Sequence, residues 1–321
     1  MLYDHQVPAV SSNFVARLQI APEHDPVFLT YLHSTLYAIR LNARAIKQTT
    51  GIQNLDISAY LGELVCFPPL FEQRAIAAFL DRETAKIDAL ISKKERLIEL
   101  LQEKRSALIS HTVTKGLNPN ILLKHSGVEW LGKIPEHWEV KRLRYLANIT
   151  TGDRDTVDRQ DDGKYPFFVR SQKVERIDSW SFDGEAVLTA GDGAVGEVFH
   201  YINGKFDFHQ RVYKFSNFST VIGKFFFYYL RSMLRIRISQ GTAKSTVDSL
   251  RLPMLLDFPV AAPPFSEQAA IAAFLDREME TLDNLIVKVE KANELLREFR
   301  TALISAAVTG KIDVREETEC T

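Results

Sequence analysis

The sequence predicts an α+β protein in which globular α+β domains are separated by two long antiparallel helices in coiled-coil packing. Three observations predict this class: a long-range repeat, an apolar seam within each copy of the repeat, and strand and turn signals between the copies. The 321 residues are 45% hydrophobic and 25% charged, the composition of an ordinary globular protein with room for two or three domains.

The repeat joins two segments that lie far apart in the chain. Residues 72–83 read EQRAIAAFLDRE, and residues 267–278 read EQAAIAAFLDRE, so only the third position differs. The same offset of 195 residues relates the proline pair at 68–69 to the pair at 263–264. Solenoid repeats have periods of about 20–50 residues, so this spacing indicates a duplicated module instead.

Each copy of the repeat predicts one long helix. Steps of four and three residues, taken alternately from Leu80 or Leu275, follow a mostly apolar seam like that of a coiled coil. Proline pairs precede both copies, and Gly116 and Gly310 follow them, as expected at helix ends. We expect the two copies to pack against each other in antiparallel fashion; pairing with another chain is the alternative. The seam residues expected at this inter-helix or subunit interface are Leu80, Ile87, Ile91, Leu101, Leu108, Leu275, Leu282, Ile286, Leu296 and Leu303.

The segment between the two copies predicts a separate α+β domain. Short apolar runs alternate there with turn signals such as Asp161-Asp162-Gly163 and Asn203-Gly204, which are typical of strands and hairpins. Residues 224–235 then predict a helix. The domain opens near residue 136, after a linker, and runs to about residue 264.

The N-terminal segment resembles the later part of that domain. Residues 29–34 parallel residues 227–232, so residues 1–70 are interpreted as the C-terminal part of a second domain of the same kind. About 65 residues that follow Trp138 have no counterpart before Met1. We therefore expect the first domain to be truncated or to be completed by another chain.

Positive charge is concentrated in one stretch of the chain. The formal net charge is −1, but the segment from Lys205 to Arg251 holds nine Lys or Arg and two acids, a local balance of +7. Interleaved His, Gln and Tyr residues could contact base edges while the cations meet phosphates. Residues 241–245 (GTAKS) add a small polar loop that suits close backbone approach. The alternative interpretation is a solvated basic face without a ligand.

Two apparent catalytic motifs lack the neighbouring secondary structure or partner residues that such sites require. Gly191–Gly196 fits G-x-G-x-x-G, but Asn203-Gly204 follows soon after, so we expect a hairpin in place of a nucleotide-binding helix. His209 near Asp207 has no second His or serine elbow, which favours a surface or DNA-facing histidine. No P-loop, methylation loop or nuclease carboxylate cluster is found, so we expect no catalytic residues and no metal site in this chain.

The remaining composition bounds the cellular location. No run of about 18 apolar residues occurs, and the N-terminus lacks a basic start before an apolar stretch. Cys66 and Cys320 give no disulfide framework or zinc spacing. We expect a cytoplasmic protein without membrane contact.

Four motifs together resemble one protein family. They are PPLFEQRAIAAFLD at 68–81, ALIS at 107–110, VTKGL at 113–117 and SGVEWLGKIPEHW at 126–138. From about residue 25 onward the chain resembles the specificity (S) subunit of type I restriction-modification systems. The resemblance implies a non-catalytic subunit whose target-recognition domains each read half of a bipartite DNA sequence, while two long helices conserved in the family set the gap.

The resemblance also implies partners. These are double-stranded DNA, methyltransferase (M) subunits that carry S-adenosylmethionine, and a restriction/translocase (R) subunit that uses ATP and magnesium; no cofactor is expected in this chain. Self-association of partial subunits would restore two-fold symmetry and is held as a hypothesis. The alternatives are a coiled-coil scaffold or an inactive truncated remnant without DNA recognition.

The resemblance assigns a role to each segment. The expected division is 1–70, C-terminal part of a first target-recognition domain; 71–116, long helix 1; 117–135, linker; 136–264, complete second target-recognition domain; 265–311, long helix 2; and 312–321, tail. Within the second domain, polar and basic residues are the candidates for DNA contact. They are Arg170, Gln172, Lys173, His209, Gln210, Arg211, Arg231, Arg235, Lys244 and Ser245.

Overall fold

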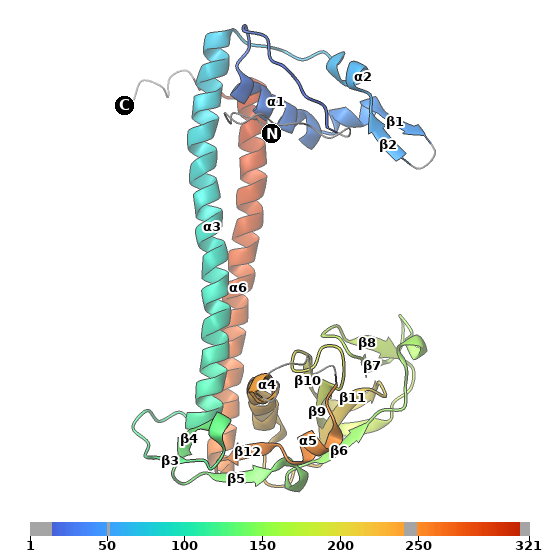
Figure 1. The fold of residues 1–321 in the computed structure, drawn as a ribbon, viewed down its shortest axis with the longest axis vertical. Coiled ribbons are helices and arrows are strands. Elements are labelled where there is room, and N and C mark those ends of the chain that lie inside the picture. Colours follow the sequence, from blue (N-terminus) through green and yellow to red (C-terminus); the bar gives the residue numbers. More distant parts are fainter. Residues whose placement is uncertain (1–14, 50–51, 241–248, 315–321) are drawn as a thin grey trace. The chain divides into compact units, whose positions relative to one another are not determined.

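The computed structural model describes residues 15–49, 52–240 and 249–314, which form two compact units (Figure 1). Unit 1 is built from the chain before Leu100 and after Leu285, and unit 2 from Leu100–Leu285. Helices α3 (Leu70–Lys115) and α6 (Phe265–Val308) each contribute one segment to both units. None of the described helices combines the length and the apolar character that a membrane span requires.

Helices α3 and α6 are antiparallel in both units. In unit 1, Asp88 and Glu95 of α3 pair with Arg300 and Arg297 of α6, so rising numbers on one helix meet falling numbers on the other. In unit 2, Arg105 of α3 pairs with Asp283 of α6 and Gly116, next to the end of α3, lies beside Glu267, so rising numbers again meet falling numbers. Every seam residue named above is buried or partly buried. This packing confirms the fold class that the repeat predicts.

Unit 1 places a small α/β segment on the helix pair. It contains α1 (Pro26–Ala38), a 3₁₀ turn η1 (Leu41–Ala45), the hairpin β1 (Ile46–Thr49) and β2 (Ile52–Leu55), and α2 (Ile57–Leu61). Asp25 caps α1 by accepting a hydrogen bond from the Phe28 backbone N (2.8 Å), and Pro26 opens the helix. Phe28 of α1 is fully buried in a core that includes Leu80 of α3 and Ala307 of α6.

Unit 2 contains a six-stranded sheet in its described part, in the order β6-β11-β9-β10-β7-β8. All neighbouring pairs are antiparallel except β10 and β7, which are parallel. The strands are β6 (Asn148–Thr151), β7 (Tyr165–Phe168), β8 (Glu175–Ile177), β9 (Phe182–Ala190), β10 (Phe199–Phe208) and β11 (Val212–Ser216).

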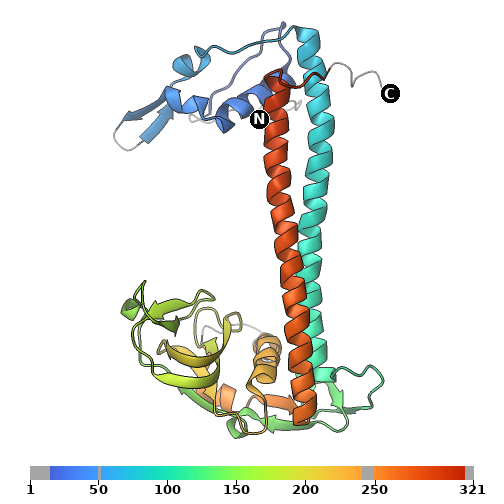
Figure 2. The ribbon, with the colours of Figure 1, turned by 180° about the vertical axis from the view of Figure 1, so that it is seen from behind.

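Helix α4 (Gly223–Gln240) lies between this sheet and α6 (Figure 2). Its Phe226 ring meets the ring of Phe215 on β11 at a centroid distance of 5.3 Å, and both side chains are fully buried. On the other side, the Tyr228 hydroxyl donates a hydrogen bond to Asp276 of α6 (2.6 Å). The helix therefore joins the sheet to the long helices.

Shorter elements link the sheet, α4 and the long helices within unit 2. They are β3 (Leu123–His125) paired with β4 (Lys133–Pro135), β5 (Glu139–Arg142) paired with β12 (Pro259–Ala262), α5 (Leu252–Leu256), and the 3₁₀ turns η2 (Glu129–Leu131), η3 (Leu143–Tyr145) and η4 (Thr156–Asp158). Trp138 lies just before β5 and is fully buried, and its indole N–H donates to Glu267 on the first turn of α6 (3.1 Å). This contact attaches the start of the domain to the helix that follows it.

The duplication reappears as two glutamines with the same hydrogen bonds. The side-chain amide of Gln73 on α3 donates to the backbone O of Pro68 (2.8 Å), and its oxygen accepts from the backbone N of Asp25 (2.8 Å). Gln268 on α6 likewise donates to Pro263 O (2.8 Å) and accepts from Ile222 N (2.7 Å). Both glutamines are buried. We call these two arrangements the glutamine locks.

The locks also correct the alignment of α1 with α4. Asp25 and Ile222 directly precede the two helices, and the Tyr31–Asp81 hydrogen bond (2.7 Å) in unit 1 has the same form as that of Tyr228 in unit 2. These equivalences give an offset of 197 residues, whereas the expected match of 29–34 with 227–232 has an offset of 198. That match was wrong by one position because aromatic helical segments look alike at neighbouring registers.

Candidate nucleic-acid interface

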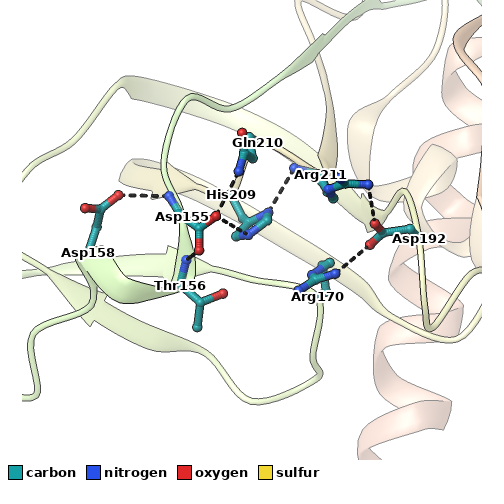
Figure 3. Close-up of polar contacts among 8 residues, drawn as sticks. All are labelled: Asp155, Thr156, Asp158, Arg170, Asp192, His209, Gln210 and Arg211. Carbon is teal, nitrogen blue, oxygen red and sulfur yellow. Dashed lines mark hydrogen bonds and ion pairs between the residues drawn. The ribbon is translucent and has the colours of Figure 1, made fainter.

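Four connecting segments of the described sheet meet at one place in unit 2 (Figure 3). They are the loop after β6, the segment after β7, the loop after β9 and the turn between β10 and β11. Backbone hydrogen bonds join segments that are distant in sequence. They run from Gln210 N to Arg154 O (2.8 Å), from Gly191 N to Arg211 O (2.8 Å) and from His209 N to Phe168 O (2.9 Å). We call this convergence the loop cluster.

Two exposed arginines of the loop cluster share one carboxylate. Arg170 binds one oxygen of Asp192 (3.1 Å), and Arg211 binds the other (2.9 Å). The carboxylate side chain is 16% exposed, whereas the two arginine side chains are 45% and 62% exposed. Two cations on one anion leave a net positive charge. Each guanidinium keeps most of its five N–H donors for a ligand outside the protein.

Asp155 orders the opposite side of the loop cluster. Its carboxylate caps η4 by accepting from the Thr156 backbone N (2.6 Å), and it also accepts from the side-chain amide of Gln210 (2.8 Å). These bonds lower the pKa of Asp155, first through the backbone N–H of Thr156, so the carboxylate is charged at neutral pH. Gln210 is exposed, and its hydrogen bond to Asp155 holds its side chain in one orientation at the surface.

His209 supports the turn from inside the loop cluster. It is 1% exposed, and its Nδ1 accepts a hydrogen bond from the backbone N of Arg211 (2.9 Å). Burial lowers the pKa of His209, and the positive charge of Arg170 lowers it further, which favours the neutral ring that this acceptor role requires. The expected surface histidine is therefore wrong, because the turn folds the imidazole inward against Asp155 (3.9 Å).

Asp207 does not join His209 in a catalytic or metal-binding pair. Its buried carboxylate accepts hydrogen bonds from Ser179 (2.8 Å) and Ser181 (2.7 Å) and contacts Arg154 (3.4 Å). These partners satisfy a charge that would otherwise be costly to bury. Among the described residues, no group of three or more His, Cys, Asp or Glu side chains could hold a metal ion.

The glycine motif at 191–196 serves the loop cluster. It connects β9 to β10, which pair as an antiparallel hairpin, so a strand and not a nucleotide-binding helix follows it. The expected hairpin turn at Asn203-Gly204 is wrong, because both residues lie inside β10 and pair with β9. A Cβ on Gly191 would lie 2.9 Å from the Arg211 backbone O, so glycine allows the close approach of the two loops. Beside this motif lies a shallow hollow of about 350 Å³, lined by Thr156, Val169, Arg170, Ser171, Glu175, Asp192 and Gly193.

The other candidate residues are distributed over several places. Gln172 and Lys173 are exposed close to Arg170, and Lys173 faces Glu175 (3.3 Å). Arg235 is exposed on α4 next to the glycine loop, since a Cβ on Gly196 would lie 3.7 Å from the Arg235 Cα. Arg231 lies instead toward α3 and α6, where Arg105 and Asp283 influence its charge. Lys244 and Ser245 fall outside the described residues.

Sequence reasoning missed the two carboxylates that organise the loop cluster. Asp155 and Asp192 counted only as negative charge, although both position cationic or amide groups. The signal for Asp192 was its place between Gly191 and Gly193, a turn in which an Asp side chain can face neighbouring loops. Asp155 begins the Asp-Thr-Val-Asp capping sequence of η4.

The model of the type I restriction modification DNA specificity domain matches residues 135–296, half of the chain. The chain belongs to this family. The match covers the whole sheet of unit 2, the loop cluster and much of α6. Specificity subunits of type I systems are thus its relatives, and they are DNA-recognition subunits.

Individual relatives agree with this assignment. The chain is 33% identical over 181 residues to the EcoDI specificity subunit of Escherichia coli, covering 56% of this chain and 40% of that subunit. It is 26% identical over 315 residues to the MjaVIII specificity subunit of Methanocaldococcus jannaschii, covering 87% and 70% of the two chains. The chain therefore spans less than half of the first subunit and about two thirds of the second.

Solved structures show the same fold. A chain from a structure on complex assembly and conformational transition of the type I R-M system aligns with a TM-score of 0.64 at 19% identity, covering 90% of this chain and 72% of that chain. The HsdS subunit from Thermoanaerobacter tengcongensis aligns with a TM-score of 0.53 at 16% identity, with coverages of 90% and 71%. Both comparisons support the α+β architecture with long helices.

Proposed function

We propose that this chain is the DNA sequence-recognition subunit of a type I restriction-modification complex and that the loop cluster of unit 2 contacts double-stranded DNA. The observation that carries the proposal is the pair of exposed arginines on one partly buried carboxylate, within the region that the specificity-domain model matches. In this proposal the chain reads sequence and contributes no catalytic group.

The geometry suits both parts of DNA recognition. Asp192 holds the guanidinium groups of Arg170 and Arg211 close together, and each can donate two parallel hydrogen bonds to a guanine edge or a phosphate. The amide of Gln210 is the type of group that pairs with an adenine edge. Asp192 and Asp155 already hold these arginine and glutamine side chains in place before DNA binds. The side chains would therefore lose little conformational entropy on binding.

We further propose that the long helices bind the methyltransferase subunits. The seam side chains of α3 and α6 are buried or partly buried by packing within the chain. Several large apolar side chains of these helices that lie outside the seam remain exposed. They are Leu90, Leu97, Leu295 and Phe299 in unit 1, and Leu100 and Leu285 in unit 2. Such side chains at helical spacing suit a partner helix. Methylation with S-adenosylmethionine would then belong to the M subunits, and ATP- and magnesium-dependent cleavage to the R subunit.

The test is to co-express the chain with its methyltransferase subunit and to sequence the methylation sites of host DNA. We expect a bipartite or palindromic motif with methylated adenine that disappears when the gene is deleted. The double variant Arg170→Gln, Arg211→Gln should lose the motif, and Lys124→Gln, an exposed cation on β3, should keep it.

Each other outcome has a meaning. A motif that survives in the double variant would show that the loop cluster is not the reading surface. A stable complex without any motif would indicate that this chain does not recognise DNA. Failure to form any complex with the methyltransferase subunit would favour the scaffold function.

Self-association is tested separately, by light scattering of the chain alone. A measured mass equal to one chain would exclude it.

A further inference from the structure

The two copies of the helix repeat differ at an arginine–aspartate pair. In unit 1, Arg300 binds Asp88 through two parallel hydrogen bonds, Nε to Oδ1 (2.9 Å) and Nη2 to Oδ2 (3.1 Å). The pair at the same repeat positions in unit 2 is Arg105 and Asp283, where Nη1 meets Oδ1 at 2.8 Å. The Nε of Arg105 is buried and has no hydrogen-bond partner among the described residues.

A second arginine stands beside the incomplete pair. Arg231 of α4 makes no hydrogen bond or ion pair with any described residue, and it is partly buried. Burial lowers the pKa of Arg231, and the positive charge of Arg105 lowers it further. The unit 1 residue equivalent to Arg231, at the offset of 197, is Ser34, so unit 1 has no second cation here.

The position of Arg231 follows from how α4 is attached. Tyr228 and Lys224 both bind Asp276 of α6, at 2.6 Å and 3.2 Å. Asp283 lies two helical turns after Asp276, and Arg231 lies about one turn after Tyr228, so Arg231 is held toward Asp283. The negative charge of Asp283 raises the pKa of Arg231, in agreement with this placement.

The charges at this place do not balance. Asp283 is paired with Arg105, and no described carboxylate pairs with Arg231, so one positive charge at this place has no ion-pair partner. A phosphate would complete the arrangement, because arginine binds phosphate with parallel hydrogen bonds. The cations also continue toward the loop cluster: Arg235 lies one turn after Arg231 on α4, and the glycine loop packs against it.

We propose that Arg105 of α3 and Arg231 of α4 together bind a backbone phosphate of the DNA that the loop cluster reads. A long helix would then contact DNA itself, in addition to connecting the units. This inference rests on the proposed function, since it requires that unit 2 bind DNA.

Salt dependence of binding provides the test. DNA affinity of the complex with the methyltransferase subunit is measured over a series of salt concentrations. One phosphate contact contributes about 0.9 to the slope of log K against log salt. We expect Arg105→Gln and Arg231→Gln each to reduce the slope, and the double variant to reduce it by about 0.9. All three variants should weaken specific and non-specific duplexes by similar factors. Arg231→Lys should restore most of the slope, because lysine still neutralises a phosphate.

Arg300→Gln is the matched control, since it changes the equivalent pair in the copy that has no second arginine. Its slope should equal that of the unmodified chain. The inference is overturned if Arg231→Gln keeps the full slope in a folded protein, or if Arg300→Gln reduces the slope equally. If the unmodified complex binds no DNA, the proposed function fails as well, so the two failures are distinguishable. Stabilisation by inorganic phosphate without a change in DNA slope would also overturn it, by indicating an anion other than DNA.

Discussion

Replacing Gln268 by glutamate should destabilise unit 2 strongly, although the two side chains have nearly the same shape. Gln268 is fully buried, donates to the backbone O of Pro263 (2.8 Å) and Thr220 (3.1 Å), and accepts from Ile222 N (2.7 Å). A carboxylate keeps the acceptor role but has no donor. Both backbone oxygens would therefore lose their partner and face a negative charge.

The expected loss follows from these contacts. A buried polar group left without its hydrogen bond costs about 1–3 kcal/mol, so two such groups give roughly 2–6 kcal/mol at neutral pH. For a domain of this size each kcal/mol corresponds to roughly 2–4 °C in Tm, which predicts a fall of about 4–24 °C. Burial would raise the pKa of the introduced carboxyl above its unfolded value. Acidification would therefore protonate it in the folded state and relieve part of the loss.

Tryptophan fluorescence is the assay, because the three tryptophans of the chain, Trp130, Trp138 and Trp180, all belong to unit 2. Thermal unfolding followed by fluorescence therefore reports on the unit that Gln268→Glu changes. Gln73→Glu alters the equivalent lock in unit 1 and is the matched control; it should lower the fluorescence midpoint much less. A loss below about 1 kcal/mol for Gln268→Glu would refute the reasoning, because two buried acceptors cannot lose their donor at so little cost.

Three further predictions concern other parts of the chain. Gly152→Ala should destabilise unit 2 by about 3 kcal/mol or more, since a Cβ would lie 1.9 Å from the backbone O of Phe208. The fluorescence midpoint measures this, and an unchanged midpoint would contradict it. Burial lowers the pKa of His200 below its unfolded value. The neutral imidazole therefore contributes stability that is present above about pH 6.5 and is lost as the pH falls. His200→Gln should flatten the pH dependence of the thermal unfolding midpoint between about pH 7.5 and 5. Phe299→Ser should weaken co-purification with the methyltransferase subunit and leave the Tm nearly unchanged, because this side chain is 57% exposed; full co-purification would exclude Phe299 from that interface.

The sequence was sufficient for features that depend on local pattern. The repeat and its seam predicted α3, α6 and their antiparallel packing, because burial of an apolar stripe has few solutions for helices of this length. The Asn203-Gly204 signal indicated strands after the glycine motif, although the residues lie inside the long strand β10 and not at a tight turn. The hairpin is closed instead by the glycine motif itself.

The features that sequence could not predict depend on contacts between distant segments. Burial of His209 follows from the turn between β10 and β11, and the shared carboxylate of Asp192 requires segments 19 and 22 residues away to meet. Arg231 has the same composition signal as Arg235, yet only the attachment of α4 to Asp276 directs it toward α3. Patterns within one sequence do not indicate which distant segments will meet in the folded chain.

The glutamine locks have a consequence for how this chain can change over time. Apart from a weak contact between Gln73 and His24, the hydrogen-bond partners of the lock glutamines among the described residues are backbone N–H and C=O groups. Main-chain atoms are the same whatever side chains the neighbouring residues carry. The locks themselves are therefore largely indifferent to the side chains of the segments that they hold, and surface loops can diverge or be exchanged between genes while this part of the joint still fits.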